Sequence, residues 1–509
     1  MESAKRTISL GAFYIGLQGA VSYLAIFLSY VFLTRILDPV DIGKLPLLNA
    51  TFAVCQTTTM LCLQFATVKF VSEFVGCGRT DRASDVFWSA IRLVGVASIS
   101  GFAVVVFLSP QLSELILGTR GDAGLLILTV LSELVSNFGN ILLSVLWGLS
   151  SFRKMAASNL AGTLLERILG ILLAWLGFGL QGLVAGWLIG AFATLALAIV
   201  FAGPYLKRWR NPVPAKEMLA YSYPILLVSL VTLAQNWADV TILYALTSNL
   251  IDTGVYYLGV AGSGIMSLLS AALIWAVFPT LSAMFGRGET EPFKEALRVS
   301  QRLLNMLMMP IGFALAAVAG TAVTVAYGRA YAGATIPLTI LAASSILPAY
   351  LSLMTYVLQA IRRTQALIRI CTAAALTEIA LTVILVPPLN VMGSALARVG
   401  TSTVGILVSY AYLKDSWWPK IERTSLAKST MLAALVGIVL FLFDSFATSA
   451  MGIGSLGRGL LDMMVFLFVY VAGLIGLRLV LPEDLEKLEA VLPTSLQPWV
   501  GRIRHWLTA

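Results

Sequence analysis

Apolar residues run along this chain in long stretches that short polar segments separate. A helix that crosses a bilayer needs about 20 consecutive, mostly apolar residues. In hydrocarbon only helices and closed barrels satisfy their own backbone groups, and runs such as Leu93 to Leu108 lack the alternation of a barrel strand. The pattern therefore predicts an all-α polytopic membrane protein.

The apolar runs predict about fourteen transmembrane helices. They lie near residues 8–34, 43–66, 86–108, 123–149, 155–175, 180–202, 221–246, 254–279, 303–326, 336–360, 366–386, 391–413, 427–447 and 460–480.

Basic residues are distributed unevenly between the predicted connections. Segments on one side hold 27 Lys and Arg, and those on the other side hold five. Positive charge collects on the cytoplasmic side of a membrane, so both chain ends are predicted to be cytoplasmic. The net charge of +9 then reflects topology and does not indicate a nucleic-acid partner. The last residues, 481–509, mix apolar and charged side chains and are interpreted as an interfacial tail, with a partly disordered tail as the alternative.

An internal repeat appears when the chain is compared with itself at an offset close to 211 residues. Gly43 aligns with Gly254, and Gly182 aligns with Gly393. Six spans per copy is an even number, so both copies insert in the same orientation. The pattern predicts a six-helix lobe over 1–210, a second six-helix lobe over 211–425, and two extra helices with the tail over 426–509.

The chain shows none of the common sequence signatures of enzymes or metal proteins. It has no Walker motif or other nucleotide-binding loop, and its one histidine is His505 in the tail. The four cysteines lack metal-ligand spacing. ATP-driven transport and membrane-bound enzymology are therefore disfavoured, and no cofactor is expected.

Two segments carry a resemblance to a known family. Thr34 to Gly43, and then Phe65 to Phe74 with the Gly78-Arg79 turn, resemble the polysaccharide and O-antigen type flippases. These proteins belong to the multidrug, oligosaccharidyl-lipid and polysaccharide exporter superfamily. The stretch Gly11 to Leu33 carries no charge, so it lacks both the arginines of the peptidoglycan-precursor flippases and the acidic residue of many drug antiporters.

The resemblance implies a V-shaped pair of lobes, as in the multidrug (MATE) exporters, with a central cleft and alternating access. It also implies transfer of a polyprenyl-linked saccharide across the cell membrane. Membrane lipids are expected partners, and glycan-assembly enzymes are possible ones. Because one scaffold hosts several functions, a cation-coupled multidrug exporter stays open as the alternative.

Ionisable residues inside predicted spans are costly and are candidates for function. The candidates for substrate binding are Asp239, Arg398, Arg35 and Arg167, of which Arg35 lies just outside a span. The candidates for coupling to H⁺ or Na⁺ are Glu166, Glu378 and Glu133.

Each of these residues also has a structural interpretation, as an ion pair between helices or a side chain that reaches the interface. For Asp239 the structural interpretation is a hydrogen-bonded carboxyl group. Glu378 and Arg398 lie at similar predicted depths and can pair across neighbouring helices. Trp147, Trp187, Trp237 and Trp275 are candidates for stacking on sugar rings, although packing is the commoner role of tryptophan.

Overall fold

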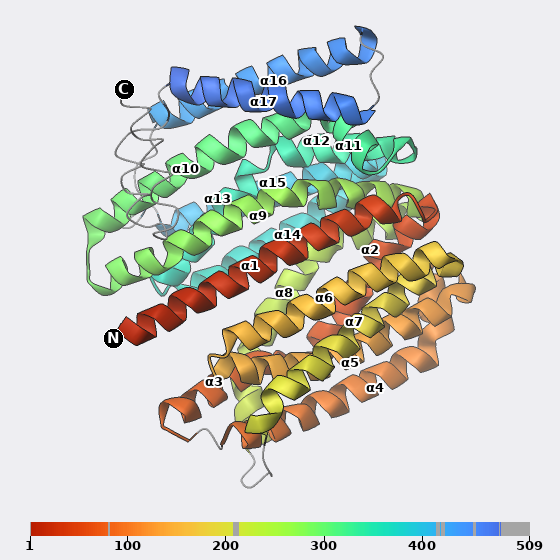
Figure 1. Cartoon of the computed structure of the whole chain (residues 1–509), viewed down its shortest axis with the longest axis vertical. Coiled ribbons are helices and arrows are strands. Elements are labelled where there is room, and N and C mark those ends of the chain that lie inside the picture. The colour runs from red at the N-terminus through yellow and green to blue at the C-terminus, as the bar shows by residue number, and fades with distance from the viewer. Residues whose placement is uncertain are drawn as a thin grey trace. The chain divides into compact units, whose positions relative to one another are not determined.

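The computed structural model describes residues 2–79, 82–206, 213–413, 418, 423–450, 455–477 and 479. Within these ranges the chain forms seventeen α-helices and no β-strand (Figure 1). The helices are α1 (Glu2–Leu33), α2 (Pro39–Met60), α3 (Leu63–Gly76), α4 (Ala83–Leu117), α5 (Ala123–Gly148), α6 (Phe152–Leu173), α7 (Gly179–Ala202), α8 (Ala215–Thr247), α9 (Leu250–Gly286), α10 (Thr290–Ala317), α11 (Ala319–Ala326), α12 (Thr335–Ala343), α13 (Ile346–Ala360), α14 (Thr364–Leu389), α15 (Val391–Leu413), α16 (Arg423–Ala450) and α17 (Ser455–Gly476).

Most of these helices are long and apolar enough to cross a bilayer. Among the described residues, eleven helices meet this requirement, or up to thirteen if each of two bent helix pairs counts as one span. The prediction of an all-α polytopic membrane protein is confirmed. The predicted tail, 481–509, lies outside the described residues.

Two of the predicted spans are bent. The run at 43–66 is divided into α2 and α3, whose axes differ by 46°, and the run at 336–360 is divided into α12 and α13, whose axes differ by 45°. Between α2 and α3, Leu61 and Cys62 both take the left-handed conformation, with φ of 52° and 56°. That conformation cannot continue a right-handed helix, so the chain changes direction there.

The chain divides into two compact units. Unit 1 contains residues 1–258 and 378–394, and therefore α1 to α8 with parts of three later helices. Within it, α4, α5, α6 and α7 run side by side (Figure 1). Helices α6 and α7 approach closely because glycines line their interface: a Cβ at Gly190 would lie 2.7 Å from the carbonyl oxygen of Gly162.

Unit 2 contains residues 259–377 and 395–509. Helices α16 and α17 pack on each other, and α16 also packs along α10 (Figure 1). The hydroxyl of Tyr470 on α17 donates to the carbonyl oxygen of Met306 on α10, at 3.2 Å. The boundary between the units falls inside α9, and the lobe limits near 210 and 425 remain predictions.

Candidate functional site

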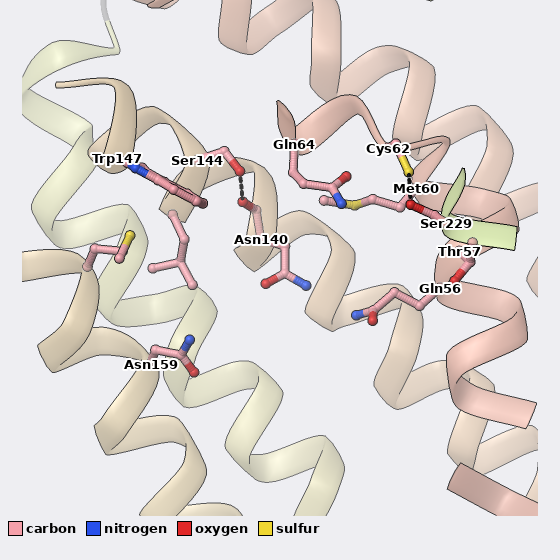
Figure 2. Close-up of a pocket in the computed structure, with 12 residues that line it drawn as sticks. Gln56, Thr57, Met60, Cys62, Gln64, Asn140, Ser144, Trp147, Asn159 and Ser229 are labelled. Carbon is pink, nitrogen blue, oxygen red and sulfur yellow. Dashed lines mark hydrogen bonds between the residues drawn. The ribbon is translucent and has the colours of Figure 1, made fainter. Parts of the chain in front are cut away.

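A cavity of about 310 Å³ opens within unit 1 where α2 bends into α3 (Figure 2). The residues that line it are Gln56, Thr57, Met60, Cys62, Gln64, Asn140, Leu143, Ser144, Trp147, Met155, Asn159 and Ser229. We call it cavity 1.

The lining of cavity 1 is rich in hydrogen-bonding groups and carries no formal charge. Seven of its twelve residues are Gln, Asn, Ser or Thr, and none is Asp, Glu, Lys or Arg. The oxygen Oε1 of Gln64 is buried without a hydrogen-bond partner in the described structure. Amides and hydroxyls both donate and accept, which is what a ligand with many hydroxyl groups requires.

Helix periodicity and the bend bring these side chains together. On α5, Asn140, Ser144 and Trp147 are spaced by four and three residues, so they share one face of the helix. Opposite them, the last turn of α2 supplies Gln56 and Met60 (Figure 2).

Cavity 1 is also held together by bonds between its own residues. The Ser144 hydroxyl donates to the backbone carbonyl of Asn140 at 2.7 Å, and the Cys62 thiol donates to the Ser229 hydroxyl at 3.3 Å (Figure 2). The second bond joins the start of α3 to α8. Trp147 is 42% exposed, so neighbouring residues leave part of its surface uncovered.

A second cavity, cavity 2, has a volume of about 350 Å³ and lies within unit 2. It is lined by seven serines, by Tyr356, and by Arg398 as its one charged residue. The serines are Ser263, Ser267, Ser270, Ser344, Ser345, Ser352 and Ser402. Two of them, Ser344 and Ser345, lie at the bend between α12 and α13.

Of the predicted charged site residues, Arg398 is the one that lines either of these two cavities, and of the predicted tryptophans Trp147 lines cavity 1. Glu166 and Arg167, which are neighbours on α6, form an ion pair at 2.8 Å. Arg35 lies exposed in the turn that follows α1, and Glu378 on α14 is 1% exposed. The pairing of Glu378 with Arg398 stays a prediction.

Asp239 lies inside unit 1 and is 0% exposed. Its carboxylate accepts a hydrogen bond from the Tyr256 hydroxyl on α9 and another, at 2.8 Å, from the backbone N–H of Val240. The predicted role of Asp239 in a central cleft stays a prediction, and its hydrogen-bonded state matches the structural interpretation.

An aromatic cluster lies on the same helices. The ring of Tyr257 stacks on Trp237 with centroids 6.2 Å apart and meets Tyr30 of α1 edge to face at 5.7 Å. The hydroxyl of Tyr30 donates to that of Tyr257 at 3.4 Å. Of the other predicted tryptophans, Trp187 packs against Phe52, and the side chain of Trp275 lies outside the described structure.

Glu133 belongs to a buried hydrogen-bond network on α5. Its Oε1 accepts from the Thr59 hydroxyl of α2 at 2.7 Å and from the side-chain amide of Asn137. The same amide donates to Thr59 at 2.8 Å and to Ser98 of α4 at 2.9 Å. Three helices of unit 1 therefore meet around one carboxyl group.

The neutral amides of cavity 1 were not among the predicted site residues. Gln56, Gln64, Asn140 and Asn159 carry no charge, so a search for ionisable residues passes over them. A signal was present in the sequence, because an amide inside an apolar run also needs a partner.

Known proteins provide a second line of evidence. Residues 32–336, more than half of the chain, match the model of a family described as polysaccharide biosynthesis protein. The chain is 22% identical over 372 residues to the probable flippase AglR of Haloferax volcanii, a match that covers 70% of this chain and 74% of that protein. It is 25% identical over 334 residues to the succinoglycan biosynthesis transport protein ExoT of Rhizobium meliloti, covering 62% of each.

Solved structures share the fold. The lipid II flippase MurJ, in an inward closed conformation, superposes with a TM-score of 0.69 at 16% identity, over 89% of this chain and 98% of that one. An inward-facing multidrug resistance transporter of the MATE family gives a TM-score of 0.64 at 14% identity, over 77% of this chain and 93% of that one. These likenesses show the fold.

Proposed function

The chain belongs to the polysaccharide biosynthesis protein family, and from this premise we propose that it is a flippase that moves a lipid-linked saccharide across the cell membrane. The names of the flippase AglR and the transport protein ExoT support this function. Transport of this kind needs no bond to be made or broken, so the protein acts as a transporter and not as an enzyme.

Cavity 1 is the observation that carries the proposal. A saccharide head group cannot cross hydrocarbon unaided because each hydroxyl that loses water without a replacement hydrogen bond costs several kcal/mol. Cavity 1 offers seven neutral amide and hydroxyl side chains together with the indole of Trp147. Sugars present the matching hydroxyls and, on their C–H faces, a surface for an aromatic ring.

The proposed architecture has fourteen crossings. The segment Phe152–Tyr205 is one apolar stretch of 54 residues, but it contains a break at Gly177 and Gly179, which both have positive φ. Helices α6 and α7 pack together on either side of that break. If this segment is counted as two crossings, the maximum number of spans rises from thirteen to fourteen.

The internal repeat supports two lobes of six crossings each. Shifted by about 211 residues, α1 coincides with α8, the bent pair α2 and α3 with α9, and α7 with α15. A Cβ at Gly254 would lie 2.9 Å from the backbone nitrogen of Gly43. Gly43 and Gly254, which the repeat aligns with each other, are therefore in close contact within unit 1.

The charged residues complete the proposal. Arg398 in cavity 2, with Arg35, Arg167 and Asp239, is proposed to meet the phosphates or polar groups of the substrate, and Glu166, Glu378 and Glu133 are proposed for coupling to H⁺ or Na⁺. The basic residues of the connections support cytoplasmic ends. Glycan-assembly enzymes are proposed partners, since they supply and consume lipid-linked saccharides.

The proposal is tested by reconstituting the full chain in vesicles with a fluorescent lipid-linked oligosaccharide and measuring how fast the label becomes accessible to an external quencher. The double variant Asn140→Ala, Asn159→Ala is expected to slow transfer at least about tenfold, since each lost hydrogen bond is worth roughly 1 kcal/mol. Thr58→Ala is the control, because Thr58 is exposed and its hydroxyl bonds to the carbonyl oxygen of Val54 in its own helix.

Two results would contradict the proposal. Transfer by the wild-type protein no faster than in empty vesicles, together with export of cationic dyes, would favour the multidrug exporter. Equal transfer rates for the double variant and Thr58→Ala would remove cavity 1 from the saccharide path.

A further inference from the structure

The carboxyl group of Glu133 is buried in unit 1, and the described part of the chain gives it no basic partner. Glu133, Asn137 and Ser98 are 0% exposed, and Thr59 is 8% exposed. None of the ion pairs found among the described residues includes Glu133. An ionised carboxylate in such surroundings is costly unless a positive charge neutralises it.

The neighbouring helices supply no such charge at this level. On α6, Glu166 and Arg167 pair with each other, and on α3 Lys69 pairs with Glu73. Helix α7 contains no ionisable residue. On α4 the ionisable residue nearest to Ser98 in sequence is Arg92, six residues away and so about 9 Å along the axis. On α2 the titratable neighbour of Glu133 is the thiol of Cys55. A bound proton can neutralise the Glu133 carboxylate without requiring additional space between the packed helices.

The Thr59 hydroxyl has two acceptors for its single hydrogen. One is Oε1 of Glu133 at 2.7 Å, and the other is the backbone carbonyl oxygen of Cys55 at 2.8 Å. When Glu133 is ionised, Thr59 donates to the carboxylate. When Glu133 is protonated, its O–H donates to Thr59, and the Thr59 hydrogen turns to Cys55. The network therefore accommodates both states with its heavy atoms in place.

This network is continuous with cavity 1. Thr59 lies in the last turn of α2 beside the bend, and its neighbours Gln56, Thr57 and Met60 line the cavity. On α5, Asn140 follows Asn137 by three residues, so the helix turn that bonds Glu133 leads directly to the cavity wall.

The second copy of the repeat does not preserve the network. At an offset of 211, Thr59 corresponds to Ser270, Glu133 to Ser344 and Asn137 to Pro348, and all three of these residues line cavity 2. The carboxyl group and the amide are thus particular to unit 1. If this hydrogen-bond network were needed to fold each copy of the repeat, the second copy would be expected to contain it as well.

We propose that Glu133 is a proton-binding site and that Thr59 transmits its protonation state to the bend between α2 and α3, and so to cavity 1. The inference deepens the proposed function by naming a proton as the coupling ion. Its binding step is independent of that function, because a proton on Glu133 can be measured without any saccharide.

Infrared difference spectroscopy of the purified full chain tests proton binding. The carbonyl stretch of a buried protonated carboxyl group is expected in the wild type, shifted in D₂O, and absent from Glu133→Gln. Asp462→Asn is the matched control, since Asp462 is an equally buried acid of unit 2 at 3% exposure, and this variant should keep the Glu133 band. Identical spectra for the wild type and Glu133→Gln would overturn the proposal.

Alkylation of Cys62 in cavity 1 tests the transmission. Its rate in Glu133→Gln, which is permanently neutral, is expected to match the wild type at low pH and to differ at high pH by about fivefold or more, the lower end of typical coupling between sites. Comparing the two proteins at one pH cancels ionisation of the thiol, and Cys371 of unit 2 serves as the internal control.

Thr59 variants separate transmission from a purely structural effect. Thr59→Val removes the hydroxyl and should abolish the pH-dependent difference, whereas Thr59→Ser should retain it. A pH-dependent difference that persists in Thr59→Val would overturn the role of Thr59. Neither measurement uses substrate, so vesicles that show no transfer would count against the proposed function and leave these results to decide the proton site.

Discussion

At the scale of single residues, three acids of unit 1, Asp239, Glu133 and Glu166, are held in different ways. Asp239 accepts from a tyrosine and a backbone N–H, Glu133 from a threonine and an amide, and Glu166 pairs with Arg167. Removing a donor from a buried carboxylate leaves it unsatisfied, which costs more than the hydrogen bond contributes on balance.

The adjacent residues Tyr256 and Tyr257 allow the cost of removing such a donor to be measured. Tyr256→Phe removes a donor from Asp239 and is expected to lower the free energy of unfolding by roughly 1–3 kcal/mol. Tyr257→Phe removes only a long hydrogen bond, of 3.4 Å, with the Tyr30 hydroxyl, and should lower the free energy of unfolding by less. Thermal unfolding in detergent compares the two, and an equal or larger loss in Tyr257→Phe would contradict the assignment.

At the scale of helices, close approach depends on glycine at particular positions. Helix α7 presents Gly182, Gly186 and Gly190, spaced by four residues, toward α6. Small residues at this spacing let the backbones of membrane helices approach each other, where van der Waals packing holds them.

Gly190→Ala tests this interface. The new methyl group would meet Cβ of Glu166 at 2.5 Å and the Gly162 carbonyl oxygen at 2.7 Å, so a loss of about 1–3 kcal/mol from overpacking is expected. Gly16→Ala is the control, because nothing lies within 4 Å of its Cβ position in α1. Because alanine has a higher helix propensity than glycine, Gly16→Ala should leave the stability of the protein unchanged or slightly raised. Similar melting temperatures for the two variants would contradict the close packing of α6 and α7.

At the scale of the whole molecule, the proposed topology places successive connections on opposite sides of the membrane. Thr119 precedes α5 and Ser151 follows it, and the 26 residues of that helix span about 39 Å. Cysteines introduced singly at these two positions, with the exposed Cys77 replaced by serine, should react with an impermeant thiol reagent from opposite sides. Ser151 is expected on the cytoplasmic side. Labelling of both from one side would refute the topology.

The sequence by itself determined the class of fold and where most helices lie. Lipid imposes long uninterrupted apolar runs, and such runs are visible without any tertiary information. The segment Thr34 to Gly43 and the repeat at 211 residues also came from the sequence, and the family match agrees with the resemblance.

The tertiary structure alone decided which polar residues meet. Hydropathy does not register the left-handed Leu61 and Cys62, so a bent pair of helices looks like one continuous run. Cavity 1 is assembled from α2, α3, α5, α6 and α8, and contacts between segments so far apart in sequence depend on helix packing. Ionisable residues attract notice in an apolar sequence, but neutral amides such as Asn140 and Asn159 show their common direction only after the helices have packed.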